Sequence, residues 1–211
     1  MARPARVSPE RILAAAAQEF AARGYAGARV DHIARRARVN KAMLYYHFGS
    51  KQALYRTLLR QTFSAAAARL RDAVAGPLPP ARKVELLVST FAAFVSQHAY
   101  FPAIMLREIA EGGAHLDRDT LAVLASLPAV VGDVVRDGAK LKALCPMHPV
   151  AAYFTIVAPI VLYLSGTPIR KALAAHKLAD VAALTPELFI RQLQASVRLA
   201  LVAPDRTDST P

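Results

Sequence analysis

Apolar side chains recur along the chain at intervals of three and four residues, which is the period of amphipathic helices. Near the N-terminus this period predicts four helices, over about residues 9–23, 29–36, 40–48 and 51–74. Polar residues support these boundaries, because Gly24 is a typical helix stop and the side chains of Asn40 and Ser50 can cap the helices that follow them.

A segment rich in proline and glycine, Gly76-Pro77-Leu78-Pro79-Pro80, then interrupts the helical pattern and predicts a domain boundary. After it, the same period predicts helices over about residues 84–95, 102–111, 117–141, 149–165, 168–176 and 186–202. Pro128 is expected to kink the helix in which it lies. The chain is therefore predicted to be an all-α protein, with a disordered tail over residues 204–211.

Composition agrees with this fold class. The chain has 211 residues, 55% of them hydrophobic, which suits one large domain or two small ones with a sizeable core. Its positive charge is uneven: residues 1–60 hold twelve Lys and Arg against three Asp and Glu, whereas the rest of the chain is nearly balanced. This asymmetry predicts a polyanionic partner for the N-terminal segment, either nucleic acid or an anionic membrane surface.

Residues 143–169 contain no Asp, Glu, Lys or Arg, a run long enough to raise the question of a membrane span. Prolines within the run argue against a span; they are Pro146, Pro149, Pro159 and Pro168. A helix that is apolar on every side can equally be buried in a bundle or at a subunit interface. With a single cysteine, Cys145, and no leader-like segment, we expect a cytoplasmic protein without an intrachain disulfide.

The helices predicted over 29–36 and 40–47 are joined by a turn around Ala37-Arg38-Val39, which is the sequence form of a helix-turn-helix. Apolar residues of both helices can form a small core with Phe20 and Leu54. The side chains left outside can neutralise phosphates or hydrogen-bond to them; they are Arg29, Arg35, Arg36, Arg38, Asn40, Lys41, Tyr45, Tyr46, His47 and Lys51. Because His47 has no other His or Cys three or four residues away, no metal site is predicted there.

The stretch from Gly24-Tyr25 through Ile33-Ala34 to Leu44-Tyr45-Tyr46-His47-Phe48 and Ser50-Lys51 resembles the DNA-binding domain of the tetracycline-repressor (TetR) family, over about residues 8–55. The resemblance implies that Tyr45, His47 and Lys51 contact phosphates. It implies groove-facing roles for Lys41, Ala42, Met43 and Tyr46, and Arg29 and Asn40 complete the predicted DNA-binding set. The chain departs from the family pattern in the turn, where Arg38 stands at the usual position of glycine.

The resemblance also implies a domain organisation. Residues 1–55 would form the helix-turn-helix DNA-binding domain, the helix over about 51–74 would link the domains, and residues 77–203 would form a helical ligand-binding and dimerisation domain. Helices 149–165 and 186–202 would pair with their copies in a homodimer. The two-fold symmetry of such a dimer predicts a palindromic operator in double-stranded DNA.

Candidates for a ligand pocket come from the predicted helices of this second domain. The apolar candidates are Phe91, Phe94, Met105, Tyr153 and Phe154, and the polar ones are His98, Arg107, Glu108 and His148. For each of them a packing role is an alternative, and Arg107 and Glu111 at i, i+4 have the spacing of an ion pair. No cofactor and no metal is predicted, and the effector would be an unknown small molecule.

Two hypotheses about function follow. The first is a non-enzymatic, dimeric transcriptional repressor that a small-molecule effector releases from its operator. The second is a small helical enzyme or carrier whose basic N-terminus binds an acidic partner. The sequence contains no G-x-G-x-x-G, Walker, H-E-x-x-H or G-x-S-x-G motif, which disfavours an enzyme. A DNA-binding protein anchored in a membrane by residues 149–165 is a third alternative.

Overall fold

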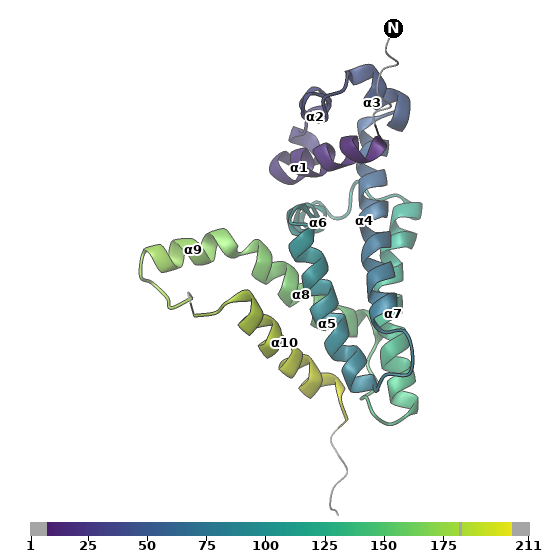
Figure 1. Ribbon diagram of the computed structural model, residues 1–211, viewed down its shortest axis with the longest axis vertical. Helices are drawn as coiled ribbons and strands as arrows, with labels where there is room; N and C mark the ends of the chain where they lie inside the picture. The colour runs from purple at the N-terminus through teal and green to yellow at the C-terminus, as the bar shows by residue number, and fades with distance from the viewer. Residues whose placement is uncertain (1–7, 182, 204–211) are drawn as a thin grey trace, which may run out of the picture. The chain divides into compact units, whose positions relative to one another are not determined.

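The computed structural model describes residues 8–181 and 183–203. Within these residues the chain is helical, with no strand and one isolated bridge between Leu144 and Val202. Its helices are α1 (Pro9–Gly27), α2 (Val30–Arg36), α3 (Lys41–Phe48), α4 (Lys51–Ala73), α5 (Pro80–Gln97), α6 (Tyr100–Ala110), α7 (Arg118–Lys140), α8 (Pro149–Ser165), α9 (Thr167–Ala175) and α10 (Pro186–Leu201) (Figure 1). The predicted all-α fold is confirmed. The tail predicted to be disordered lies outside the described residues.

The helices fall into two compact units. The first comprises Met1–Ser64 and His98–Val123, and the second comprises Ala65–Gln97 and Leu124–Pro211. The long helices α4 and α7 each contribute to both units. α6 belongs to the first unit, because it packs on α1. The functional domains predicted over 1–55 and 77–203 divide the chain differently, and they remain a prediction.

The core of the first unit joins α1, α2, α3 and the start of α4. Side chains with 0% exposure come from each of these helices; they include Ile12, Phe20, Ile33, Leu44 and Leu54. Burying one such side chain stabilises the fold by about 1.5–3 kcal/mol. The Phe20 ring also meets the Tyr55 ring edge to face, with 4.7 Å between the ring centroids. The two short helices α2 and α3 are therefore held by tertiary packing on longer ones.

In the second unit α5 packs against α8 and α10. The α5 side of this core contains Phe91 and Phe94, which are at most 1% exposed and have their ring centroids 6.5 Å apart. α8 supplies Ile156 and Ile160, and α10 supplies Val197, all at most 1% exposed. Most of the uncharged run seen in the sequence is thus the helix α8, one side of which lies in this core.

No single helix among the described residues is long and apolar enough to cross a membrane. α8 and α9 meet the criteria of length and composition only together, as a pair bent by 51° at the break between them.

Gly24 and Pro128 lie within two of the helices. The helix that begins at Pro9 is broken at Gly24, as the sequence predicted, because Gly24 has a non-helical φ of +68° and ψ of 177°; beyond this kink a short helical segment extends α1 to Gly27. Glycine reaches this positive φ without the steric cost that a side chain would impose. Pro128 lies inside α7, as expected, and the kink predicted there stays a prediction.

Candidate DNA-binding surface

α2 and α3 form a helix-turn-helix with an apolar interior. Ile33 and Ala34 of α2, Ala37 of the turn and Leu44 of α3 are at most 4% exposed. Helices of seven and eight residues are too short to be stable alone. Their placement therefore depends on these apolar residues and on the packing of α2 against α1.

The turn between the two helices is a Schellman motif. The amide of Val39 donates to the carbonyl of Ala34 at 3.0 Å, and the amide of Arg38 donates to the carbonyl of Arg35 at 3.1 Å. Arg38 has a φ of +52°, the left-handed conformation that glycine usually supplies. An L-residue in this conformation costs about 1–2 kcal/mol. Arg38 thus makes the turn that the family pattern usually assigns to glycine, at a cost in backbone strain.

α3 begins with a side-chain cap and exposes most of its surface. The Asn40 side chain accepts a hydrogen bond from the amide of Met43 at 3.0 Å, as its capping residue type predicts. Lys41 and Ala42 are exposed, and Tyr46 is 83% exposed, whereas Leu44 is the residue buried in this helix. Met43 and Tyr45 are about two-fifths exposed, at 37% and 41%. The outward surface of α3 therefore carries an amine, a thioether and two phenols.

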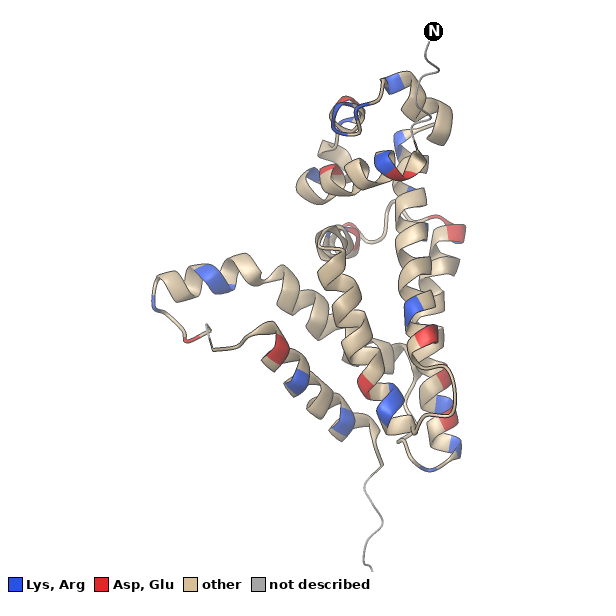
Figure 2. Cartoon of the chain, in the orientation of Figure 1, with Lys and Arg blue, Asp and Glu red and all other residues tan. Residues whose placement is uncertain are grey.

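Arginine residues lie before α2, at its end and in the turn that leads to α3 (Figure 2). Arg29 precedes α2, Arg35 and Arg36 end it, and Arg38 lies in the turn; all four are exposed. His47 is partly buried and contacts the rings of its neighbours Tyr46 and Phe48, with centroids 5.4 and 6.2 Å away. Such a mixture of cations and hydrogen-bond donors suits a phosphate backbone.

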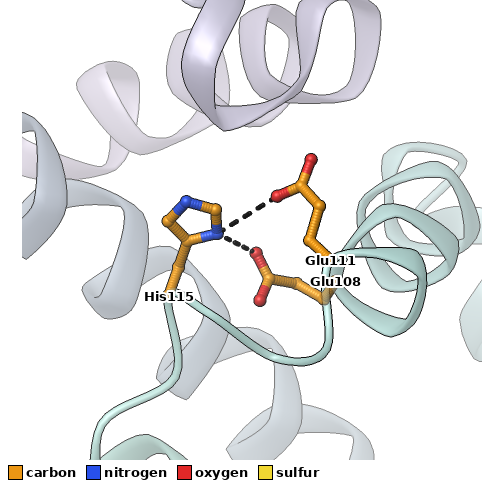
Figure 3. A group of neighbouring side chains, drawn as sticks. All are labelled: Glu108, Glu111 and His115. Atoms are coloured by element: carbon orange, nitrogen blue, oxygen red, sulfur yellow. Dashed lines mark hydrogen bonds and ion pairs between the residues drawn. The ribbon is translucent and has the colours of Figure 1, made fainter.

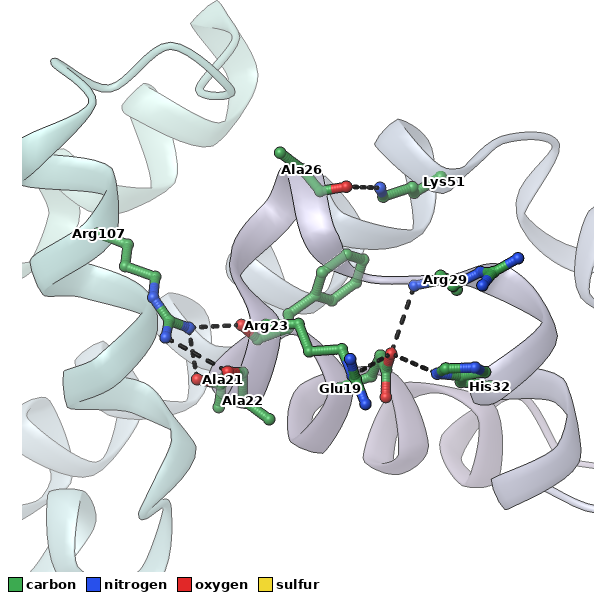
Figure 4. A network of polar contacts seen from close by, with 10 residues as sticks. Glu19, Ala21, Ala22, Arg23, Ala26, Arg29, His32, Lys51 and Arg107 are labelled. Atoms are coloured by element: carbon green, nitrogen blue, oxygen red, sulfur yellow. Dashed lines mark hydrogen bonds and ion pairs between the residues drawn. The ribbon is translucent and has the colours of Figure 1, made fainter.

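A buried carboxylate, Glu19, joins α1 to the start of α2 (Figure 4). Its Oε1 accepts from the Arg29 amide at 3.4 Å and lies 3.1 Å from His32 Nδ1 and 3.2 Å from Arg23 Nε. Glu19 is 3% exposed, and a buried charge is tolerated only with such partners. Glu19 is not among the residues that the sequence predicted for the DNA-binding surface. Its signal was a glutamate within the apolar stripe of α1, next to Phe20.

Two lysines of the predicted DNA-binding set already have partners within the chain. Lys51 Nζ donates to the carbonyl of Ala26 at 3.2 Å and lies 4.7 Å from the Tyr25 ring centroid, and burial lowers the pKa of Lys51 (Figure 4). Lys41 Nζ lies 2.9 Å from Asp31 Oδ1. This exposed pair raises the pKa of Lys41 and lowers the pKa of Asp31, through its hydrogen bond and its charges. Exposed ion pairs are weak, so a phosphate can replace Asp31.

Arg107 was a candidate for orienting a ligand, but its side chain forms hydrogen bonds within the first unit. Its guanidinium donates to the carbonyl oxygens of Phe20, Ala21 and Ala22 (Figure 4). These carbonyls precede the break at Gly24, so Arg107 caps the end of a helical segment and its charge complements the helix dipole. The ion pair with Glu111 expected from i, i+4 spacing does not form, because Glu111 Oε2 faces His115 Nδ1 at 3.4 Å instead.

The other candidate pocket residues are divided between the two units. His98, Met105 and Glu108 lie in the first unit with Arg107, and the second unit holds Phe91, Phe94, His148, Tyr153 and Phe154. Tyr153 is buried like the two phenylalanines of α5, whereas Phe154 is 54% exposed. The amide of Val150 donates to His148 Nδ1 at 3.3 Å, which caps α8. A ligand-binding role for these residues stays a prediction.

Two cavities in the second unit are lined by other residues. One of about 410 Å³ lies among the end of α4, the start of α5 and α7, and its charged residues are Arg71, Lys83, Asp133 and Asp137. The other, of about 380 Å³, lies among α8, α9 and the segment that leads into α10. None of the nine predicted pocket residues lines either cavity.

Comparisons with known proteins agree with a DNA-binding role. Residues 12–58, which span the helix-turn-helix, match the family of bacterial regulatory proteins described as the tetR family. The chain is 29% identical to the HTH-type transcriptional repressor NicS of Pseudomonas putida over 181 residues, which cover 81% of this chain and 82% of that protein. It is 27% identical to the HTH-type transcriptional regulator RutR of Escherichia coli K12 over 195 residues, which cover 90% and 87% of the two proteins.

The fold is also found in solved structures. The putative transcriptional regulator SCO4942 from Streptomyces coelicolor superposes with a TM-score of 0.67 and 27% sequence identity, over 92% of this chain and 98% of that one. The helix-turn-helix, its cationic surround and these matches define a DNA-binding transcriptional regulator. Residues 12–58 carry the DNA-binding domain of the TetR family, and over most of its length the chain is similar to regulators of this kind. Members of this family are regulators and not enzymes, so the alternative of a small helical enzyme is set aside.

Proposed function

We propose that this protein is a dimeric transcriptional repressor that binds a palindromic operator through α3 and is released by a small-molecule effector. The observation that carries the proposal is the outward surface of α3, where Tyr46 is 83% exposed and where Lys41 and Met43 are exposed as well. A recognition helix with these side chains can enter a major groove. The description of the similar protein NicS as a repressor supports the direction of regulation. Acting on chromosomal DNA, such a repressor would work in the cytoplasm.

Within this proposal the DNA-binding residues divide into two groups. Tyr45, His47 and Lys51 would hold the helix on phosphates, together with Arg29 and the capped start of α3 at Asn40. Lys41, Ala42, Met43 and Tyr46 would face the groove. The lysine amine can donate to guanine, and the small Ala42 side chain can lie against a thymine methyl group.

Dimerisation is supported by an apolar stripe on the outer side of α8. Val150, Phe154 and Leu162 are 43%, 54% and 60% exposed, and with Ala158 they recur every four residues along one side of the helix. Leu199 of α10, in the same unit, is 87% exposed. Large apolar side chains gathered on two neighbouring helices are typical of an interaction surface. The occupant we propose is a second copy of the chain, related by a two-fold axis.

The cavity of about 410 Å³ supports a site for the effector in the second unit. Its volume lies within the range of small-molecule sites. Since Arg71 and Lys83 line it with Asp133 and Asp137, it would suit a polar effector with charges of both signs.

The dimer is tested by placing charges in the α8 stripe. In the double variant Phe154→Lys and Leu162→Lys, sedimentation velocity should show a monomer, with the dimer dissociation constant raised at least about 100-fold because four buried apolar side chains are lost per dimer. Its affinity for DNA selected by the parent protein should fall as well. The control is Leu178→Lys, at a position that is 73% exposed after α9 and should leave the dimer intact. A double variant that stays dimeric would contradict the proposed interface.

A further inference from the structure

Three potential metal ligands converge where α6 ends in the first unit (Figure 3). Glu108 lies in the last turns of α6, Glu111 follows its last residue, and His115 lies in the loop before α7. Gly112 and Gly113 both have positive φ, at 68° and 74°, and turn the chain so that His115 faces the carboxylates. His115 Nδ1 lies 2.8 Å from Glu108 Oε1 and 3.4 Å from Glu111 Oε2. One donor atom from each of the three side chains lies within 4.8 Å of the others.

The inner carboxylate of this group is incompletely satisfied. Glu108 is 2% exposed, and its Oε1 accepts from the Tyr55 hydroxyl at 2.7 Å as well as facing His115. Its other oxygen, Oε2, is buried without a hydrogen-bond partner among the described residues. A buried charged oxygen without a partner is costly. A cation held by this carboxylate would remove that cost.

We propose that Glu108, Glu111 and His115 bind a divalent transition-metal ion, for which Zn²⁺ is the probe. One imidazole nitrogen and two carboxylate oxygens form a ligand set that suits zinc and its first-row neighbours better than magnesium or calcium, which prefer oxygen alone. Tetrahedral bonds of about 2.0–2.1 Å place two donors about 3.3 Å apart. The separations of 2.8 and 3.4 Å need only a small adjustment to reach this value. A fourth position would remain for water or a ligand.

Neighbouring residues contact the three proposed ligands and fix their orientation, as residues around a metal site usually do. The Tyr55 hydroxyl fixes the Glu108 carboxylate, and the Tyr25 ring lies against the His115 ring, with 4.0 Å between centroids. Tyr25 belongs to α1 and Tyr55 to α4, and Arg107, next to Glu108, caps α1. The metal site would therefore tie α6 to the helices that carry the helix-turn-helix in the same unit.

Because the metal site lies against the helices that carry the helix-turn-helix, metal binding should regulate the affinity for DNA. This inference about regulation rests on the proposed function. A metal that binds one arrangement of α1, α4 and α6 more tightly than another changes the affinity for DNA by the same factor by which DNA changes the affinity for the metal. The effector of this repressor would then include a divalent metal ion.

Metal binding is tested first without DNA. Untagged full-length protein, freed of metal by a chelator, is titrated with Zn²⁺ in competition with a chromophoric chelator. We expect one site per chain that becomes at least tenfold weaker in Glu111→Gln and in His115→Gln. Glu111 is exposed, so its substitution should leave the thermal unfolding of the metal-free protein unchanged. The matched controls are Glu187→Gln and His176→Gln, whose side chains are exposed in the second unit, and they should bind Zn²⁺ like the parent.

Equal Zn²⁺ affinity in the parent, Glu111→Gln and His115→Gln would overturn the site and leave the group as an ion pair between His115 and Glu108. DNA binding is then measured with and without Zn²⁺. A change of more than threefold in the parent that is absent in Glu111→Gln supports regulation, and an unchanged affinity overturns it. If Zn²⁺ binds as expected but no DNA sequence is selected, the proposed function fails while the metal site stands.

Discussion

Arg38 shows how a single backbone conformation shapes the DNA-binding unit. The turn between α2 and α3 requires a left-handed residue, and Arg38 supplies it at a φ of +52°. Arginine brings a charge close to the expected DNA backbone, which glycine would not. The chain therefore combines a strained turn with an additional cation at the binding surface.

The strain at Arg38 predicts an order of stabilities. Arg38→Gly should leave the free energy of unfolding unchanged or raise it by up to about 1 kcal/mol, because relief of strain is partly offset by the greater freedom of the unfolded chain. Arg38→Val should lower it by about 1–2 kcal/mol, since a β-branched residue is least suited to this conformation. Both variants remove the same charge, so urea unfolding followed by circular dichroism isolates the backbone effect. Equal stability of the two variants would refute the argument.

The contacts of Glu19 and Arg107 could not be predicted from the sequence around each residue. Local signals were sufficient for the caps, because Asn40 acts on an amide three residues away. Arg107, in contrast, donates to carbonyls of α1 more than eighty residues earlier in the chain. No spacing rule relates such positions. The rule for i, i+4 pairs suggested Glu111 as its partner, and that was wrong because the glycines after α6 turn the chain toward His115.

At the scale of elements, helical periodicity predicted most helices to within a few residues. It succeeded because each helix buries one apolar side, so that the pattern along the chain records the packing. It was least accurate at glycine and proline. α1 is broken at Gly24 as predicted, but a short helical segment beyond it runs to Gly27, and α6 begins at Tyr100, before the proline at position 102.

Different residues of α3 and of the first turn of α4 should contact the phosphates and the bases of DNA. Lys51→Gln and Tyr45→Phe should weaken binding to all DNA sequences alike, and Lys51→Gln should reduce the slope of log affinity against log salt by about 1. Lys41→Ala and Met43→Ala should change the preferred bases instead, with about 1–3 kcal/mol at the affected base pair. Filter binding or fluorescence anisotropy at several salt concentrations measures both effects.

The loss of DNA affinity expected in Lys51→Gln has two causes. One is the lost phosphate contact, and the other is the lost hydrogen bond from the Lys51 amine to the carbonyl of Ala26. The thermal unfolding of Lys51→Gln without DNA separates the second cause from the first. An unchanged salt slope in Lys51→Gln, or an unchanged base preference in both Lys41→Ala and Met43→Ala, would show that these roles are assigned wrongly.

In the whole molecule, the uneven distribution of charge agrees with the two functions that we propose, DNA binding in the first unit and dimerisation in the second. The helix-turn-helix lies in the segment with twelve Lys and Arg against three Asp and Glu, and the nearly uncharged α8 lies in the second unit. A basic surface suits a polyanion, and an uncharged, apolar helix suits a contact between two copies of the chain. Composition alone did not choose between DNA and a membrane surface. The geometry of α2, the turn and α3 did.

Selection of bound fragments from random double-stranded DNA tests the proposed dimeric repressor most directly. We expect an inverted repeat whose half-sites are centred about one helical turn apart or somewhat more, because a two-fold dimer places one α3 on each half-site. The same selection with Met43→Ala should alter both half-sites in the same way. Recovery of no enriched sequence, or of a single half-site without a symmetric copy, would contradict it.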